Sequence, residues 1–507
     1  MSQEHGGLLH RLLHRSEHRT STPAALNLDD IQGFILRGYR MPMVRHFLLK
    51  ARVPAQARRL LGRLVSGDES DAPQITSAQN WHVGFEPGPA DNPSEVPQIK
   101  PDYCLNLGIT WAGLLALEVK DRVPNISFRS FDAFIAGAAE RARLVGDTGT
   151  SGPENWIGGF GTGNDHVLVT LHAISPAAMT QYSGRLSALF AEDDAFQELW
   201  RGDGMALMEM QDGKPVPTTQ VHFGYTDGIS MTTIRGGPER YKPDHQQPCE
   251  PWLFVLLDEA ENYFVPEPRE LGLNGSFAVF KMIRTDVVGF ENFLQSKKDQ
   301  IDPELLAAKM CGRWRNGVPL ALSPETDSPL QGGVSAEHLN DFEYVNADGS
   351  GDPKGLLCPV GAHIRRVNPR GQPITGQGNP GGSNNTHRLI RRGMPYGPVY
   401  DPTQPYDGVE RGLLGYFINS NIENQYEFVL SQWVNDSEFA GAVRLPPKSK
   451  DPLIGTQDPA ESIFVIPQAK GAPPIRIAGL SSFITTQAAA YCFLPSITAI
   501  QFIADLA

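Results

Sequence analysis

The chain contains few cysteines and no CxxC pair. Its five cysteines are odd in number and widely separated: Cys104, Cys249, Cys311, Cys358 and Cys492. This spacing disfavours both a disulfide framework and a structural zinc site. It is typical of a protein kept in a reducing compartment.

Long hydrophobic runs are missing as well. No stretch approaches the roughly 18 consecutive apolar residues of a membrane-spanning helix. The positively charged residues 1–25 never form the apolar core of a secretory signal. We therefore expect residues 1–25 to be a mobile tail, the protein to be cytoplasmic, and membranes not to be among its partners.

Positive charge is in short supply. The 44 Lys and Arg residues are outnumbered by 57 Asp and Glu residues, which gives a formal net charge of -13. Such a chain repels a phosphate backbone, and no run of Lys and Arg is long enough to override the repulsion. We therefore expect no nucleic acid partner.

The chain is long enough for two domains, because its 507 residues exceed the size at which one hydrophobic core stops growing. Strands and helices alternate in both halves of the chain, and a segment rich in glycine, proline and charge separates them between Gly228 and Pro251. This pattern favours an α+β fold of two small units over one continuous parallel sheet. The predicted strands include residues 45–54, 103–110, 165–175 and 251–258, and the predicted helices include residues 54–65, 111–119, 176–191, 287–297, 303–314 and 421–436.

Three segments carry the residue types of a haem site. GAHIRRVNPR at 361–370 presents one histidine among three arginines, HRLIRRGMPYG at 387–397 is again rich in arginine, and HFGYTDGIS at 222–230 holds an aspartate. A neutral imidazole is a good axial ligand for haem iron, and arginines are natural partners of haem propionates. A carboxylate beside an arginine can break a peroxide bond. Together the segments indicate a haem peroxidase.

The same segments resemble three motifs of the dye-decolourising peroxidases: GxxDG at 224–228, HIRRxNPR at 363–370 and RRGxPYG at 391–397. The resemblance spans most of the chain from about Leu26 onward. It implies two ferredoxin-like domains with antiparallel sheets. The first, residues 26–235, carries the GxxDG motif. The second, residues 250–507, binds one haem b per chain, so that the haem pocket lies mainly in this second domain.

The resemblance makes His363 the expected proximal ligand of the iron. Cys358, five residues upstream, is the rival ligand, because a thiolate can also bind haem iron. The family motif favours the histidine, and a free cysteine is commonly just a buried apolar residue. Gly228 of the GxxDG motif is assigned to the cofactor site as well.

Peroxide cleavage is assigned by the same resemblance to Asp227 and Arg391. Asp227 takes a proton from H2O2 and returns it to the departing oxygen, while the Arg391 guanidinium stabilises the developing negative charge. Thr-Asp-Gly is also typical turn chemistry, and Arg392 is the alternative register for Arg391. An aspartate of ordinary pKa is ionised at neutral pH, which favours an acidic optimum.

Further residues are expected around the haem. Arg370 resembles the family's propionate-binding arginine. Of Arg365 and Arg366, one is expected to pair with a propionate and the other to face water, and Arg365 is assigned to the cofactor site. The proximal imidazole normally donates its second N–H to a carboxylate or carbonyl. Glu427 is the predicted partner, and Glu423 on the same helix face is the alternative. Both glutamates could instead be solvated.

The sequence therefore predicts a peroxidase that uses H2O2 to oxidise organic electron donors, such as dyes and phenols, in one-electron steps. The alternative is a haem-binding or haem-handling protein whose peroxidase activity is incidental. Both functions require His363, and only the peroxidase requires Asp227 and Arg391.

Overall fold

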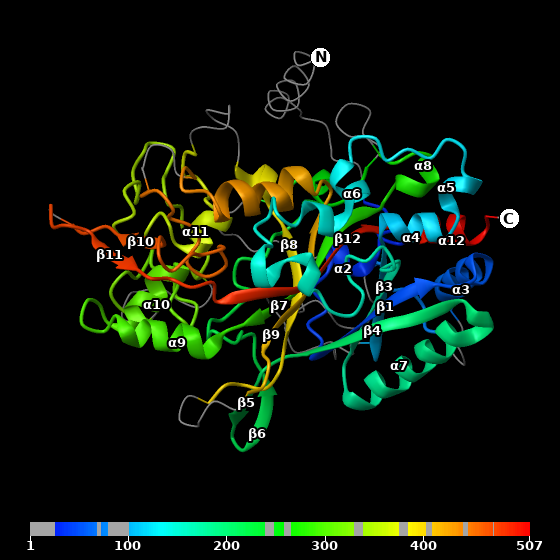
Figure 1. Cartoon of the computed structure of the whole chain (residues 1–507), viewed down its shortest axis with the longest axis horizontal. Coiled ribbons are helices and arrows are strands. Elements are labelled where there is room, and N and C mark those ends of the chain that lie inside the picture. The colour runs from blue at the N-terminus through cyan, green and yellow to red at the C-terminus, as the bar shows by residue number, and fades with distance from the viewer. Residues whose placement is uncertain are drawn as a thin grey trace, which may run out of the picture.

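The fold is α+β, as predicted, with helices packed on an eight-stranded sheet of order β4-β1-β3-β2-β12-β7-β9-β8 (Figure 1). Every pair of neighbouring strands in this sheet is antiparallel. The predicted N-terminal tail lies outside the described residues. The computed structural model describes residues 26–67, 72–79, 101–238, 248–257, 265–328, 338–374, 384–401, 408–439, 445–469 and 471–506.

The first half of the sheet has the strand order β4-β1-β3-β2, which is that of a ferredoxin-like β-α-β-β-α-β unit. Leu61 of α3 and Leu186 of α7 are buried with Phe47 of β1 in one core, so both helices cover the same face of the sheet. The elements are β1 (Met43–Ala51), α3 (Pro54–Ser66), β2 (Tyr103–Ile109), β3 (Val167–Ala173), α7 (Pro176–Ala191) and β4 (Phe196–Met205).

The second half repeats this order as β12-β7-β9-β8, so each half of the chain supplies four strands. Phe493 of β12 pairs with Ile109 of β2 and joins the two halves into one sheet. The elements are β7 (Ser276–Thr285), α9 (Val287–Ser296), α10 (Pro303–Cys311), β8 (Ile390–Tyr396), β9 (Gly412–Asn419), the π-helices η7 (Glu423–Glu427) and η8 (Val429–Val434), and β12 (Ile484–Leu494).

Helices begin where the sequence supplies a capping side chain followed by proline. Ser175 accepts the N–H of Ala178 at the start of α7, and Asp302 accepts the N–H of Leu305 at the start of α10. Each cap is followed directly by a proline, whose missing N–H costs nothing in the first turn of a helix. This local chemistry explains why α7 coincides with the predicted residues 176–191.

Two predicted elements differ from the structure. Residues 251–258 were predicted as a strand, but the described part, 251–257, contains the 3-10 helix η4 (Pro251–Leu253) and no strand. The apolar side chains there are buried, so this run indicates core packing and not strand pairing. The single predicted helix at 421–436 is the pair of π-helices η7 and η8.

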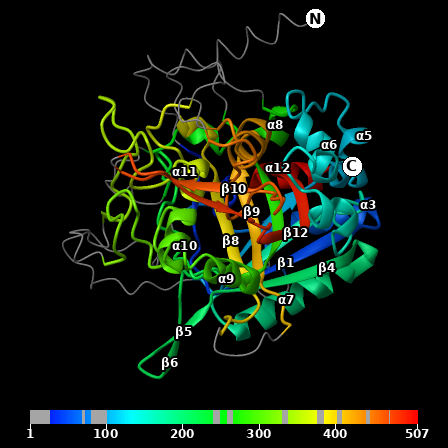
Figure 2. The same ribbon diagram turned by 60° about the vertical axis from the view of Figure 1, so that its left-hand side comes forward.

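The other elements are short, apart from α6 and α12. The strands β5 and β6 form a hairpin that projects from the body (Figure 2). The bounds are α2 (Gly33–Leu36), α4 (Trp111–Ala116), α5 (Val119–Arg122), α6 (Asp132–Arg141), η1 (Gly149–Ser151), η2 (Pro153–Asn155), η3 (Glu192–Asp194), β5 (Met208–Gln211), β6 (Lys214–Pro217), α8 (Arg269–Gly272), α11 (His363–Val367), η6 (Asn384–His387), β10 (Ile463–Ile466), β11 (Ile475–Ala478) and α12 (Ile497–Ala504).

One lobe of the molecule positions the histidine motif. The helices α9, α10 and α11 and the strand pair β10–β11 lie together beside β8 and β9, on the left of Figure 1 and again on the left of Figure 2. Within this lobe α11 packs against α10 and η8. The lobe therefore borders the edge strand β8, which carries the second arginine motif.

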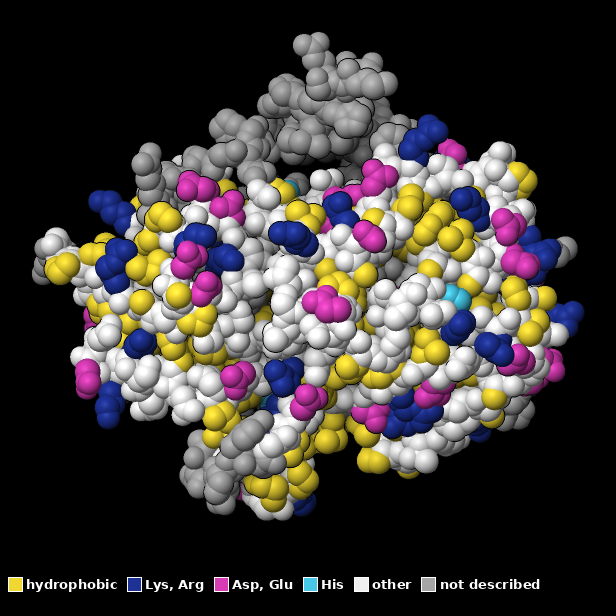
Figure 3. Space-filling model, viewed as in Figure 1, with side chains coloured by type: hydrophobic (Ala, Val, Ile, Leu, Met, Phe, Trp, Pro, Cys, Tyr) yellow, Lys and Arg dark blue, Asp and Glu magenta, His cyan; other side chains and the backbone are white. Residues whose placement is uncertain are grey.

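The surface and the cysteines agree with the composition. Acidic and basic side chains are interspersed on the face shown in Figure 3. In the part of the chain that the structure describes, no helix is both long and apolar enough to cross a bilayer. All five cysteines are described and buried, and none forms a disulfide, as expected.

Candidate functional site

Asp227 lies in a turn that its neighbours fix. Gly228 follows it with a φ of 78°, a conformation that glycine adopts without steric cost, and the Gly228 N–H donates to Asp227 Oδ1 at 2.7 Å. The N–H of Asp227 itself donates to the carbonyl of Thr219, and the N–H of Thr226 donates to the carbonyl of Arg315. The turn chemistry noted in the sequence is therefore present, and it holds the carboxylate in one orientation.

Arg391 reaches this carboxylate from the edge strand β8. Its Nη2 donates to Oδ1 of Asp227 at 2.7 Å and its Nη1 donates to Oδ2 at 3.1 Å, a bidentate ion pair. Successive residues of a strand point to opposite faces. Accordingly, Arg392 points elsewhere, and its Nε donates to the carbonyl of Phe34. Arg391, and not Arg392, is therefore the arginine that pairs with Asp227.

The ion pair lines an internal space. The side chains of Asp227 and Arg391 keep 42% and 48% of their surface accessible, yet burial is the largest influence on the pKa of Asp227 and acts to raise it. A carboxylate that is both accessible and surrounded by protein forms part of a cavity wall. The charge and hydrogen bonds of Arg391, the N–H of Gly228 and the charge of His363 outweigh burial, so the pKa of Asp227 lies below its ordinary value.

His363 begins helix α11, and its Nδ1 lies 2.9 Å from Oδ2 of Asp451. Asp451 is fully buried, and its other oxygen accepts the N–H groups of Leu453 and Ile454. The pKa of Asp451 stays below its ordinary value despite burial, because the hydrogen bonds from His363 and from the backbone favour the carboxylate. An ionised carboxylate only accepts hydrogen bonds, so Nδ1 carries a proton and Nε2 is the nitrogen left to bind a metal.

The predicted partners of His363 were wrong. Glu427 is buried in an ion pair in which Arg141 Nε donates to its Oε1 at 2.9 Å, and Glu423 accepts the N–H of Ala133. Both carboxylates therefore face α6 and neither contacts the imidazole. The two glutamates do share a face, as predicted, but that face packs against α6.

Arg365 and Arg370 both bond groups of the protein itself, and their assignment to the haem remains a prediction. Arg365 is fully buried and donates to the carboxylate of Asp352 and the amide oxygen of Gln372. Arg370 is 7% exposed and donates to the carbonyl of Asn340. These contacts hold the 340–358 region in place beside the histidine motif.

Cys358 does not fit the role of iron ligand. It is fully buried, and burial raises the pKa of its thiol to about 11. Iron binds the thiolate, and a thiol of this pKa remains protonated near neutral pH. His363, whose side chain keeps 23% of its surface accessible, is the better placed ligand.

The donors around α11 fit a haem. Among the described residues, Nε2 of His363 has no hydrogen-bond partner, and a Cβ built on Gly228 would meet nothing within 4 Å. Trp433 Nε1 and Gln372 Nε2 are buried N–H donors that find no acceptor in the described ranges. Buried donors require acceptors, and haem provides a metal for the imidazole and two carboxylates for such donors.

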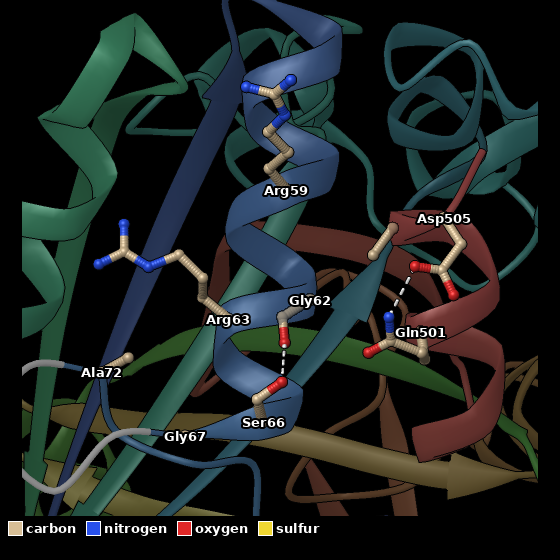
Figure 4. A pocket seen from close by; sticks show the side chains of 9 residues that line it. Arg59, Gly62, Arg63, Ser66, Gly67, Ala72, Gln501 and Asp505 are labelled. Atoms are coloured by element: carbon tan, nitrogen blue, oxygen red, sulfur yellow. Dashed lines mark hydrogen bonds between the residues drawn. The ribbon is translucent and has the colours of Figure 1, made fainter. Parts of the chain in front are cut away.

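A second opening is separate from this site. Figure 4 shows a groove of about 580 Å³ between α3 and α12. Within it Gln501 Nε2 donates to Asp505, and Arg63 pairs with Glu192 outside it. None of the motif residues lines this groove, so it is separate from the motif site.

Known proteins share most of this chain, although no protein-family model matches it. A dye-decolorizing peroxidase of Mycena epipterygia is 30% identical over 373 residues, which are 70% of this chain and 66% of that protein. Peroxidase 2 of Mycetinis scorodonius is 28% identical over 508 residues, which are 95% of this chain and 89% of that protein.

The fold is shared over nearly the whole length. A dye-decolorizing peroxidase solved in complex with 2,6-dimethoxyphenol has a TM-score of 0.73 at 24% identity, and the match covers 94% of this chain and 100% of that one. Sequence relatives and fold therefore agree over most of the chain. The chain belongs to the dye-decolourising peroxidase family of haem enzymes.

Proposed function

We propose that this peroxidase uses H2O2 to oxidise organic donors such as dyes and phenols, and that Asp227 and Arg391 cleave the peroxide bond. The observation that carries the proposal is their bidentate ion pair, which lines an internal space within electrostatic reach of His363. The phenol bound by a relative of the same fold supports a phenolic donor. The proposal includes one haem b per chain and donor oxidation in one-electron steps.

The chain's own residues would hold the cofactor as follows. His363 provides Nε2 to the iron, while Asp451 keeps Nδ1 protonated and the ring oriented. Trp433 and Gln372 provide buried N–H donors for the propionates. When bound, haem supplies the redox chemistry that these side chains lack, namely reduction of peroxide and stepwise oxidation of the donor.

Asp227 moves the proton. Its ionised carboxylate accepts a proton from one oxygen of H2O2 and passes it to the other oxygen, which leaves as water. A carboxylate has about four acceptor positions, and Arg391 and Gly228 occupy three of them. The remaining position is free for peroxide. Arg391 is always charged and cannot be the base, so its role is to stabilise negative charge as the O–O bond breaks.

The absorption spectrum of the haem-loaded protein tests the proposed function. We expect a haem band that changes on addition of one equivalent of H2O2 and returns when 2,6-dimethoxyphenol is added. A protein that takes up no haem contradicts the whole proposal. A protein that binds haem without reacting with H2O2 would instead be a haem-handling protein.

The pH profile follows from the lowered pKa of Asp227. The active base is the ionised form, and a lowered pKa keeps it ionised as the pH falls through the ordinary carboxyl range near 3.9. We expect the rate constant for reaction with H2O2 to stay level from pH 7 to about pH 4 and to fall below that. Stopped-flow measurements across this range check the prediction, and a decline that begins near pH 6 would contradict it.

Asp451→Asn is expected to slow the reaction with H2O2 by roughly 10–100-fold, the usual effect of removing a group that orients a metal ligand. The amide keeps the size of the side chain and removes the charge that makes the imidazole electron-rich. Asp352→Asn is the matched control, because this buried carboxylate pairs with Arg365 and does not contact the imidazole. Equal slowing by both variants would show that the effect is not specific to Asp451.

A further inference from the structure

Arg366 is a buried cation whose guanidinium donates hydrogen bonds to backbone carbonyl groups and lies 5.2 Å from the centre of the Phe439 ring. It is fully buried, and its donors reach the carbonyls of Gly361, Trp433, Asp436 and Ser449. These carbonyls belong to the entrance of α11, the end of η8, the turn after η8 and the segment that leads to Asp451. One side chain therefore connects the segments that carry the two members of the imidazole–carboxylate pair.

The position of Asp451 depends on this junction. The N–H of Asp451 donates to the carbonyl of Val434 at 2.8 Å, directly after the residue whose carbonyl Arg366 binds in η8. Arg366 also binds the carbonyl of Ser449, two residues before Asp451, at 2.9 Å. Helix α11 has only five residues, and a helix this short depends on contacts with neighbouring segments for its stability and orientation. Arg366 lies about one helical turn after His363, and its guanidinium holds the segment that carries Asp451 against the imidazole.

Arg365 provides the contrast within the same helix. It is equally buried, but a carboxylate compensates its charge, because Nη1 lies 3.0 Å from Asp352 Oδ2. In the described part of the chain Arg366 has no ion-pair partner, and the nearby charges that act on it are those of Asp451 and Asp436. A buried charge without a paired ion is costly. A neutral donor could hold carbonyls at a lower cost, so the charge itself has a use at this position.

We propose that Arg366 is a positioning residue for the axial ligand: it fixes Asp451 against His363 Nδ1 and balances the carboxylate charge. This inference rests on the proposed role of His363 as iron ligand. Arg366 touches neither peroxide nor donor, and it acts only through the imidazole–carboxylate pair. The arginines of the histidine motif thus divide their work, with Arg365 and Arg370 holding the 340–358 region and Arg366 holding the Asp451 segment.

The test is Arg366→Lys in the haem-loaded full-length protein. Lysine keeps the charge, but its point-like ammonium cannot reproduce the planar fork that reaches four carbonyls. Asp451 then moves from Nδ1, and the imidazole becomes less electron-rich. We expect a lower iron–histidine stretching frequency in the resonance Raman spectrum. We also expect a more positive Fe(III)/Fe(II) potential, by about 59 mV for a tenfold change in the ferric-to-ferrous ratio.

A double-mutant cycle separates positioning from general stabilisation. In the Asp451→Asn background, Arg366→Lys should change neither the frequency nor the potential further, because the carboxylate it positions is gone. Arg365→Lys, the control of equal burial, should lower the melting temperature and leave both signals unchanged. If Arg366→Lys does not fold, Arg366→Gln serves as the second variant in the same cycle.

The outcomes distinguish the two levels of the proposal. An iron–histidine band that Arg366→Lys leaves unchanged, or shifts equally in the Asp451→Asn background, overturns the positioning role. Absence of an iron–histidine band in the unsubstituted protein overturns the assignment of His363 as ligand. The inference is supported if Arg366→Lys shifts the iron–histidine band in the protein that retains Asp451 and does not shift it in the Asp451→Asn variant.

Discussion

Asp227→Ala is expected to reduce the second-order rate constant for reaction with H2O2 by roughly 10²–10⁴-fold, the usual contribution of a positioned general base. The substitution removes the acceptor that takes the peroxide proton, and no other carboxylate bonds Arg391 among the described residues. Haem content should not change, because Asp227 does not hold the cofactor in this site. Stopped-flow mixing with H2O2 measures the rate, and the pyridine haemochrome spectrum measures the haem.

Arg391→Leu tests the other half of the ion pair. Loss of the guanidinium removes the group that stabilises charge on the departing oxygen, and we expect the same rate constant to fall by roughly 10²–10³-fold. The remaining carboxylate also loses the charge that lowers its pKa, so the acid limb of the pH profile should move to higher pH. The rate constant and the position of the acid limb therefore test this substitution independently.

Arg392→Leu is the matched control, because it removes the same charge from the next residue of β8. Its Nε donates to the carbonyl of Phe34 and not to Asp227. We expect near-normal peroxide reactivity in this variant. Full turnover in both Asp227→Ala and Arg391→Leu, or a loss in Arg392→Leu that equals the loss in Arg391→Leu, would contradict the proposed mechanism.

Local sequence signals determine much of the fold. The cap and proline before residues 176–191 mark a helix start, and α7 occupies those residues. The alternating run at 103–110 corresponds to β2 at Tyr103–Ile109. The apolar run at 251–258 was predicted as a strand, and this prediction failed because burial produces the same composition in a strand and in coil. Only its place outside the sheet, a tertiary property, settled the question.

Some residues of the candidate site could likewise be predicted from the sequence, and others could not. The proposed roles of His363, Asp227 and Arg391 rest on compact motifs that resemble those of the family. Asp451 has no such signal, because it lies in KDPLIG, 88 residues after the histidine, and only the folded chain brings the two together. The contacts of the arginines in the motif could not be predicted from the sequence either. An arginine that binds backbone carbonyls and one that binds a propionate have the same sequence signal.

His363→Ala is expected to cost the protein its haem. The imidazole keeps 23% of its side-chain surface accessible, and its Nε2 has no hydrogen-bond partner among the described residues. Removing a group that merely orients a ligand costs up to roughly 100-fold in affinity, so loss of the ligand itself should exceed that. Haem titration of the apoprotein, followed by absorbance, measures the affinity.

Added imidazole should restore haem binding in His363→Ala, because the substitution leaves a space of the shape of the lost ring beside Asp451. His387→Ala is the control of the same residue type. His387 stacks on Phe428 and its Nδ1 bonds the carbonyl of Asn424, so its loss should leave haem affinity unchanged. Retention of haem by His363→Ala would return Cys358 to consideration. Burial keeps that thiol protonated, however, so binding through it would have to strengthen as the pH rises.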